Sequence, residues 1–291
     1  MNYRHHFHAG NFADVMKHAL LTGLVRAMQA KEKGALLLDT HAGRGAYHLG
    51  GAAMGDTLAR RPEWPEGIGR LWPHAPEALP PRVAELLALV RRHDRDAGGG
   101  GGSPRHYPGS PVLLRELARP VDRVAACELH PAECEALRIA LGRGRRVEVR
   151  EADGYGALRA FLPPPERRAL VLIDPPFEAA DEFARAAAAL GEALRRFPGG
   201  VYALWYPLTG RARVDDFFTA VRALNPPPAV ACELAIAGEG SALKMKGCGL
   251  LVLNPPWRWA EEAGAVLAFL AAALAQEPGG GSRLEWIVPE R

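Results

Sequence analysis

The sequence predicts an α/β protein with a doubly wound, mainly parallel sheet. Short apolar runs alternate with stretches of helical periodicity along most of the 291 residues, and this alternation is typical of parallel strands that are connected by helices. A glycine-rich turn follows the first apolar run, and acidic residues follow the next three. Because ligands bind beyond the carboxyl ends of the strands in such sheets, we expect the functional site at these turns.

The elements follow in order from the N-terminus. An amphipathic helical pattern covers residues 13–29, and the apolar run 35–38 reads as a buried strand. Six further strands are expected at 124–127, 147–150, 170–173, 201–206, 230–236 and 249–253, with helices at 131–141, 179–196, 214–224 and 263–275. Too few residues join the last two strands for a helical crossover, so these strands should form an antiparallel hairpin.

Residues 49–107 interrupt this alternation. They contain tryptophans, many prolines, one clear helical stretch at 81–92, and a run of five glycines at 98–102 that we expect to be flexible. Their apolar content is thin for an independent core. We therefore expect a small helical insertion at 49–107 in a main domain formed by 1–48 and 108–291.

The composition is that of an ordinary globular protein, with 48% hydrophobic and 24% charged residues, which excludes a disordered or fibrous chain. A net charge of +3 permits a polyanionic partner but is less basic than a dedicated nucleic-acid-binding domain. The four cysteines show no Cys-x-x-Cys spacing and are expected to be buried and reduced. The N-terminal residues resemble neither a secretion signal nor a membrane span, so we expect a cytoplasmic protein.

The first strand ends in Asp39 and is followed by Gly43 and Gly45. These glycines allow a ligand to approach the backbone closely, and a helix could begin just after them. The turn could equally be structural, because the full Gly-x-Gly-x-x-Gly pattern is absent. Glu128 ends the second strand, where a carboxylate can accept hydrogen bonds from ribose hydroxyls, and Asp153 follows the third, where it could bind an adenine amino group.

The most specific motif is Asp174-Pro175-Pro176-Phe177, which follows the fourth strand. The Asp174 carboxylate and the Pro175 carbonyl can each accept one hydrogen of an amino group, and Phe177 offers a face on which a base can stack. Holding both N–H groups orients the nitrogen lone pair for methyl transfer and stabilises the charge that develops on nitrogen. The pattern predicts methylation of adenine N6, with Asp174, Pro175 and Phe177 at the catalytic position.

A second copy of the pattern, Asn254-Pro255-Pro256-Trp257, follows the last expected strand. If that strand runs antiparallel, its carboxyl end lies at the opposite edge of the sheet. We therefore interpret this copy as a structural turn.

The N-terminal segment mixes aromatic and cationic side chains, among them Tyr3, Arg4 and His5. Its histidines lack the cysteine or carboxylate partners that a metal site usually has, and we expect no metal. Stacking on bases and contact with phosphates fit better, so these three residues are candidates for binding RNA.

Several longer motifs support a family resemblance. Tyr3-Arg4-His5, Leu38 to Gly43, Tyr107 to Pro111, Glu128 to Pro131 and Asp174-Pro175-Pro176 together closely resemble the bacterial 23S ribosomal RNA adenine-N6 methyltransferases of the J type. The resemblance implies a Rossmann-like, S-adenosylmethionine-dependent methyltransferase fold with a seven-stranded sheet, an antiparallel last strand and a small helical insertion. It also implies a monomer that acts on 23S rRNA or on a large-subunit assembly intermediate.

The resemblance assigns roles to residues as well. Asp174 would be catalytic, Tyr3 would contact RNA, and six residues would line the S-adenosylmethionine site: His18, His41, Ser110, Glu128, Asp153 and Gly154. Gly43 of the glycine turn joins them as a candidate cofactor-binding residue. His18 and Ser110 are implied by the resemblance alone. Phe177 stands where the family more often has tyrosine, which keeps the stacking face and removes a hydroxyl. The alternative functions are methylation of DNA adenine or protein glutamine, or nucleic-acid binding by an inactive protein with a methyltransferase fold.

Overall fold

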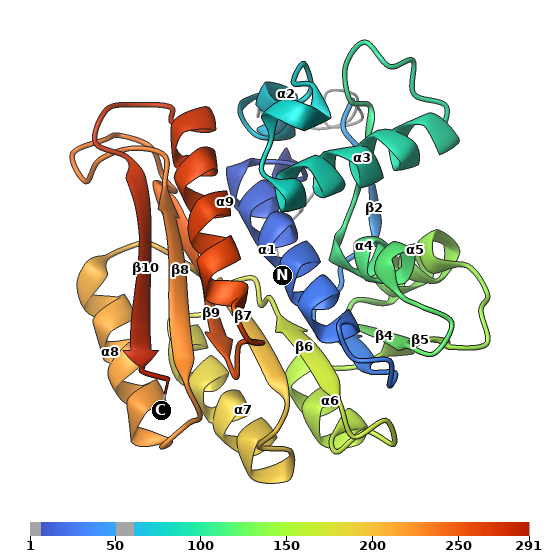
Figure 1. Ribbon diagram of the computed structural model, residues 1–291, viewed down its shortest axis with the longest axis vertical. Coiled ribbons are helices and arrows are strands. Elements are labelled where there is room, and N and C mark those ends of the chain that lie inside the picture. The colour runs from blue at the N-terminus through green and yellow to red at the C-terminus, as the bar shows by residue number, and fades with distance from the viewer. Residues whose placement is uncertain (1–6, 51–60, 291) are drawn as a thin grey trace.

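The computed structural model describes residues 7–50 and 61–290. Its main feature is an eight-stranded sheet with the order β10-β8-β9-β7-β6-β1-β4-β5 and with helices on both faces (Figure 1). This confirms the expected α/β class. The strands are β1 (Leu36–Asp39), β4 (Arg123–Glu128), β5 (Val147–Glu151), β6 (Ala169–Ile173), β7 (Val201–Pro207), β8 (Ala229–Ala235), β9 (Gly247–Leu253) and β10 (Gly281–Val288).

Strand direction divides the sheet into two parts. The strands β7, β6, β1, β4 and β5 are parallel to one another, whereas β9 runs antiparallel to its neighbours β7 and β8. The expected antiparallel hairpin is therefore present. The sheet has one strand more than the seven expected, because β10 pairs antiparallel with β8 at the edge. Its alternation of Arg283 and Glu285 with Leu284 and Trp286 lacks the continuous apolar run of the inner strands.

The helices fill two hydrophobic layers, one on each face of the sheet. Those close to the expected ranges are α1 (Phe12–Gln29), α5 (Pro131–Leu141), α7 (Glu182–Arg196), α8 (Arg211–Ala223) and α9 (Trp259–Ala273). Two further helices, α4 (Ser110–Leu117) and α6 (Gly154–Phe161), were not expected from the sequence. Both are short, and their first residues, Ser-Pro and Gly-Tyr-Gly, are also common in turns. The four cysteines are free and buried, as predicted.

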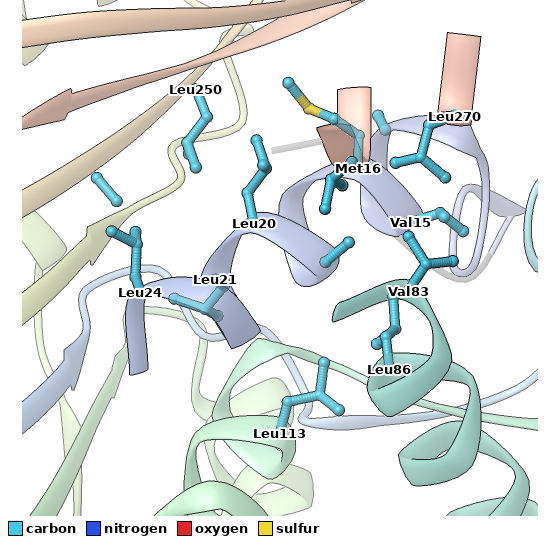
Figure 2. Packing of buried hydrophobic residues seen from close by; sticks show 14 of the residues in the cluster. Val15, Met16, Leu20, Leu21, Leu24, Val83, Leu86, Leu113, Leu250 and Leu270 are labelled. Carbon is cyan, nitrogen blue, oxygen red and sulfur yellow. The ribbon is translucent and has the colours of Figure 1, made fainter. Parts of the chain in front are cut away.

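Helix α1 is buried on almost every side, although its sequence predicted an amphipathic helix. Asn11 caps its first turn by accepting a hydrogen bond from the Asp14 N–H at 3.0 Å. Fifteen of its eighteen residues are buried, because α3, α4, α9 and the sheet pack around it. Figure 2 shows Met16 and Leu20 of α1 among apolar side chains from several of these elements.

The insertion packs against α1 through its longest helix, α3 (Pro81–Asp96), which contributes Val83 and Leu86 to the same hydrophobic cluster. The short elements η3 (Trp64–Glu66), α2 (Ile68–Leu71) and η4 (Pro76–Ala78) precede it. A two-stranded sheet of β2 (Ala46–His48) and β3 (His106–Pro108) flanks the insertion. The expectation of a helix just after Gly45 was therefore wrong, and β2 begins there instead.

The glycine run 98–102 is tied to the insertion at a defined point. Trp72 Nε1 donates a hydrogen bond to the Gly101 carbonyl at 3.0 Å. The buried Asp94 carboxylate accepts hydrogen bonds from the N–H groups of Arg105 and His106, both at 2.8 Å. These contacts direct the chain from the end of α3 into β3. The division into a main domain and an insertion remains a prediction.

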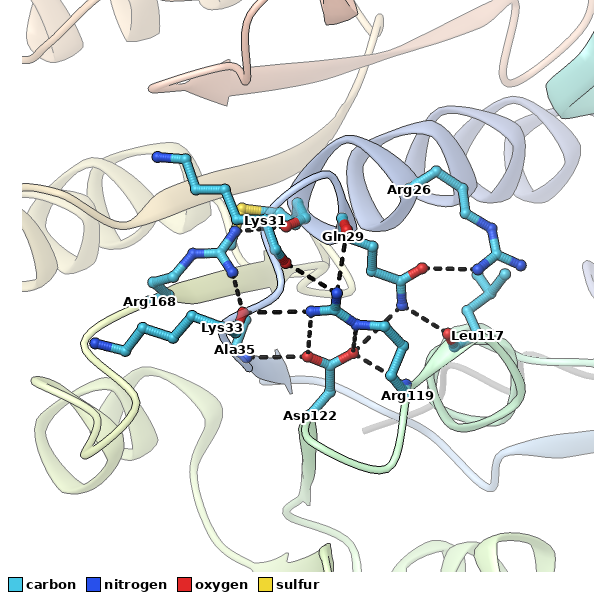
Figure 3. A network of polar contacts seen from close by, with 10 residues as sticks. Arg26, Gln29, Lys31, Lys33, Ala35, Leu117, Arg119, Asp122 and Arg168 are labelled. Carbon is cyan, nitrogen blue, oxygen red and sulfur yellow. Dashed lines mark hydrogen bonds and ion pairs between the residues drawn. The ribbon is translucent and has the colours of Figure 1, made fainter.

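A polar network fixes the C-terminal end of α1 to the amino ends of the strands (Figure 3). The buried Asp122 carboxylate accepts hydrogen bonds from the Ala35 N–H at 3.0 Å and from the Arg119 guanidinium at 3.0 Å. Arg119 also donates to the Gln29 and Lys31 carbonyls at 3.1 and 2.9 Å. Because Asp122 and Arg119 bind backbone groups at both chain junctions, α1 is held in a set position relative to β1 and β4.

Candidate active site

The carboxyl ends of four parallel strands bring acidic residues to one edge of the sheet. Asp39 ends β1 and Glu128 ends β4, while Asp153 and Asp174 follow β5 and β6. Since β1 lies between β4 and β6, these side chains share a single edge, with α1 beside it. This is the edge at which a doubly wound sheet binds its ligands.

Asp174 is held by a lysine that the sequence analysis did not identify. The Lys17 ammonium lies 2.6 Å from Asp174 Oδ2 and 2.9 Å from Asp14 Oδ1. Burial lowers the pKa of Lys17, but the carboxylates of Asp14 and Asp174 outweigh burial and raise this pKa well above its ordinary value. Lys17 is therefore charged and fixes the orientation of the Asp174 carboxylate.

The turn that follows Asp174 is rigid and strained. Phe177 has a φ of 50°, in the left-handed region that bulky residues rarely adopt. Its half-buried ring packs on Phe183 and Trp205, with centroid distances of 4.8 and 5.8 Å. Pro175 is buried beside it. Strain of this kind persists only where the surroundings compensate for it, and it is common at functional sites.

The glycine turn after β1 is joined to the end of β4. Gly43 has a φ of 59°, which favours glycine, and its N–H donates to Glu128 Oε2 at 3.0 Å. The other oxygen of Glu128 accepts a hydrogen bond from the His130 N–H at 2.7 Å. Each carboxylate oxygen keeps a second lone pair, so Glu128 can fix the turn and still accept a hydrogen bond from a ligand hydroxyl.

Asp153, Gly154 and His41 form a tightly packed corner between β1 and α6. Asp153 Oδ2 caps α6 by accepting from the Gly156 N–H at 2.7 Å. A Cβ atom on Gly154 would lie 2.2 Å from the Thr40 carbonyl oxygen and 2.7 Å from His41 Nε2, so no side chain fits there. Burial lowers the pKa of His41 to about 4, which leaves its imidazole neutral at physiological pH.

The two residues implied by the resemblance alone are both buried at this edge. His18 Nδ1 lies 2.9 Å from the Tyr107 hydroxyl, and the two rings stack at 5.6 Å. Ser110 is the first residue of α4 and interacts with Asp39. Burial raises the pKa of Asp39 to about 7, although the Ser110 hydroxyl acts in the opposite direction. Asp39 therefore titrates near neutral pH.

The comparisons with known proteins agree on one family. Residues 32–288 match the family described as ribosomal RNA large subunit methyltransferase D, RlmJ. Two proteins named ribosomal RNA large subunit methyltransferase J, from Escherichia coli K12 and Haemophilus influenzae, are 36% and 37% identical over 290 residues, which is 100% of each chain. The chain belongs to the RlmJ family.

A solved structure shares this architecture throughout. Protein LPL1258 from Legionella pneumophila superposes with a TM-score of 0.84 at 33% identity, over 96% of this chain and 98% of that one. The superposition therefore extends beyond the sheet to nearly the whole of this chain. In the ranges 7–50 and 61–290, no helix has the length and apolar character that a bilayer crossing requires.

Tyr3, Arg4 and His5 fall outside the part of the RlmJ-family chain that the structure describes. Asn254 lies at the opposite edge of the sheet, where its side-chain amide donates to the carbonyls of Pro198 and Gly200 at 2.7 and 3.0 Å. The second motif copy is thus a structural turn, as its strand direction predicted.

Proposed function

We propose that this RlmJ-family chain transfers a methyl group from S-adenosylmethionine to the N6 amino group of an adenine in 23S rRNA. The observation that carries the proposal is Asp174, which is held by Lys17 at the end of β6 and followed by the rigid Phe177 turn. This is a site for a flat ring with an exocyclic amine. The names of the two bacterial relatives support ribosomal RNA of the large subunit as the substrate.

The residues beside Asp174 at the same edge of the sheet are suited to binding S-adenosylmethionine. They would be His18, His41, Gly43, Ser110, Glu128, Asp153 and Gly154. The left-handed Gly43 turn and the close packing of Gly154 against Thr40 and His41 set the path of the backbone here, and Glu128 and Asp153 supply acceptors for hydroxyl and amino groups. When bound, S-adenosylmethionine supplies an electrophilic methyl group.

The residues of the chain then hold the acceptor base. The adenine stacks on Phe177, and its amino group donates one hydrogen to Asp174 and one to the Pro175 carbonyl. Lys17 holds the Asp174 carboxylate in a set orientation, so the carboxylate stabilises the positive charge as nitrogen gains its bond to the methyl carbon. The methylated nitrogen then releases a proton, for which Asp174 is an acceptor.

Stacking on Phe177 requires an adenine that has left its own base stack. We therefore propose a single-stranded or loosened region of 23S rRNA as the target, either in free RNA or in a large-subunit assembly intermediate. We further propose that the protein acts in the cytoplasm, where its ribosomal RNA substrate is found, and that it acts as a monomer.

Transfer of tritium from labelled S-adenosylmethionine tests the proposal. Protein-free 23S RNA, 16S RNA, duplex DNA and a glutamine-containing protein are each offered as acceptor. The labelled product is then analysed to identify the methylated group. We expect N6-methyladenosine in 23S RNA alone. Label in DNA or protein would assign a different substrate, and an absence of label together with an absence of cofactor binding would indicate an inactive binding protein.

A further inference from the structure

We propose that Arg185 and Arg213 form a clamp for the RNA phosphates that flank the target adenine. This inference rests on the proposed function. Arg185 lies on α7 and Arg213 on α8, and both helices begin after parallel strands, at the same edge of the sheet as Asp174. Both arginines are exposed. They approach the site through two different sets of aromatic rings.

Arg213 is connected to the base-stacking ring. Its guanidinium lies 5.6 Å from the centroid of Phe183, and Phe183 packs on Phe177 at 4.8 Å. Its Nη2 donates a hydrogen bond to the Ala180 carbonyl at 3.1 Å. A guanidinium has five N–H donors, so the others remain available to a ligand. Arg213 is thus two ring contacts away from the base on Phe177.

Arg185 approaches the site beside His41. Its guanidinium lies 5.2 Å from the centroid of Tyr155, and Tyr155 contacts His41 edge-on at 5.0 Å. The Tyr155 hydroxyl donates to the buried Glu182 at 2.8 Å, which fixes the ring on which Arg185 rests. Arg185 itself forms an ion pair with Glu182 through one nitrogen, Nη1, at the long distance of 3.4 Å from each carboxylate oxygen.

The positions of Arg185 and Arg213 are better suited to binding a phosphodiester than to stabilising the fold. Stacking on an aromatic ring orients a guanidinium and leaves its edge free for the two oxygens of a phosphate. Arg195 and Arg196 show the contrast, because both lie at the far end of α7 and pair with Glu192 at 2.7 and 3.1 Å. The two arginines near the site therefore have donors to spare where a polyanionic substrate must enter.

The test compares Arg185→Gln/Arg213→Gln with a control that removes the same charge. The control is Arg145→Gln/Arg146→Gln, since these exposed arginines line a hollow of about 710 Å³ at the amino ends of β4 and β5, away from the site. Binding of a short RNA that contains the target adenine is measured by fluorescence anisotropy at several salt concentrations. Methylation of the same RNA gives kcat and KM.

We expect the clamp variant to bind the RNA at least about tenfold more weakly than the wild type. The slope of log K against log salt should become less steep by about 1.4, because two phosphate contacts on a single strand are lost. The value of KM should rise while kcat changes less than about twofold, because the clamp does not touch the amine. An RNA with neutral methylphosphonates on both sides of the adenine should bind the wild type and the clamp variant equally.

Three results would overturn the clamp: an unchanged salt slope, an equal loss in the control variant, or a loss that persists in full on the methylphosphonate RNA. A wild-type protein that binds RNA and cofactor but methylates no RNA would instead contradict the proposed function. Failure of the clamp and failure of the proposed function therefore give different results in these experiments.

Discussion

The ammonium group of Lys17 lies 2.6 Å from Asp174 Oδ2 and joins the first helix to the turn after β6. Lys17 also contacts Asp14 at 2.9 Å, so a single buried cation lies between two carboxylates. Electrostatic attraction is strong where water is excluded. The orientation of Asp174 therefore depends on the packing of α1 against the rest of the molecule.

Lys17→Met should lower kcat by about 100-fold or more, because the Asp174 carboxylate loses the cation that orients it. Binding of S-adenosylmethionine, measured by calorimetry, should change little. The variant should also be less stable by about 3 kcal/mol, since Asp14 and Asp174 lose their partner.

A second variant separates these two effects. Asp14→Asn/Lys17→Met removes one carboxylate together with the cation and should recover part of the stability in thermal melts, while kcat stays low. Recovery of kcat together with stability would show that Lys17 acts only on the fold.

The two copies of the Pro-Pro motif provide a matched pair of substitutions. Asp174→Ala should abolish methylation while leaving cofactor binding largely intact, and Asn254→Ala should leave the methylation rate within about twofold. The second variant loses two hydrogen bonds to backbone carbonyls, so its thermal stability should fall by about 1 to 2 kcal/mol. Tritium transfer to RNA and thermal melts measure both effects. Activity retained by Asp174→Ala would refute the catalytic assignment.

Asp39 should make stability depend on pH. Its pKa is raised from 3.8 to about 7 in the folded protein, so the native state binds a proton more tightly than the unfolded chain does. The free energy of unfolding should therefore fall as pH rises from about 4 to about 7, by up to about 4 kcal/mol. Asp39→Asn should flatten this dependence in urea titrations, and the exposed Asp216→Asn should not. A slope that persists in Asp39→Asn would assign it to another group.

Gly154→Ala should weaken binding of S-adenosylmethionine by at least about tenfold and lower stability by about 1 to 3 kcal/mol, because its Cβ would collide with the Thr40 carbonyl. The control is Gly264→Ala in α9, where the nearest atom to a Cβ is Leu284 Cδ1 at 3.9 Å. That substitution should raise stability by about 0.5 to 1 kcal/mol. Calorimetry and thermal melts give both values. Unchanged cofactor binding in Gly154→Ala would remove Gly154 from the proposed cofactor site.

Strand direction explains why much of the fold could be predicted from the sequence. The inner strands are continuous apolar runs, and the acids that follow them must share one edge once the strands are parallel. The short connection from β8 to β9 likewise required a hairpin and removed Asn254 from the site. By contrast, β10 escaped notice because an edge strand needs only one apolar face, and Leu284 and Trp286 alternate with charged residues.

Lys17 shows what local patterns cannot reveal. Asp14 and Lys17 are three residues apart on a helix, a spacing that is typical of an exposed ion pair. The packing of α3, α4, α9 and the sheet around α1 buries this helix, and with it the pair, while Lys17 reaches Asp174 across the fold. The contact spans 157 positions in the sequence, so no window of local periodicity contains both partners.

The antiparallel direction of β9 determines the distance between the two copies of the Pro-Pro motif. Ile173 pairs with Leu204 and Leu253 pairs with Tyr202, so Asp174 and Asn254 lie level with positions four residues apart on β7. At about 3.3 Å per residue this is roughly 13 Å along the strand. Methyl transfer requires the accepting nitrogen to lie within a few ångströms of the methyl carbon. An amine bound at Asn254 would therefore be out of reach of the proposed cofactor site. Direction along a strand is thus as much a part of this motif as its four residues.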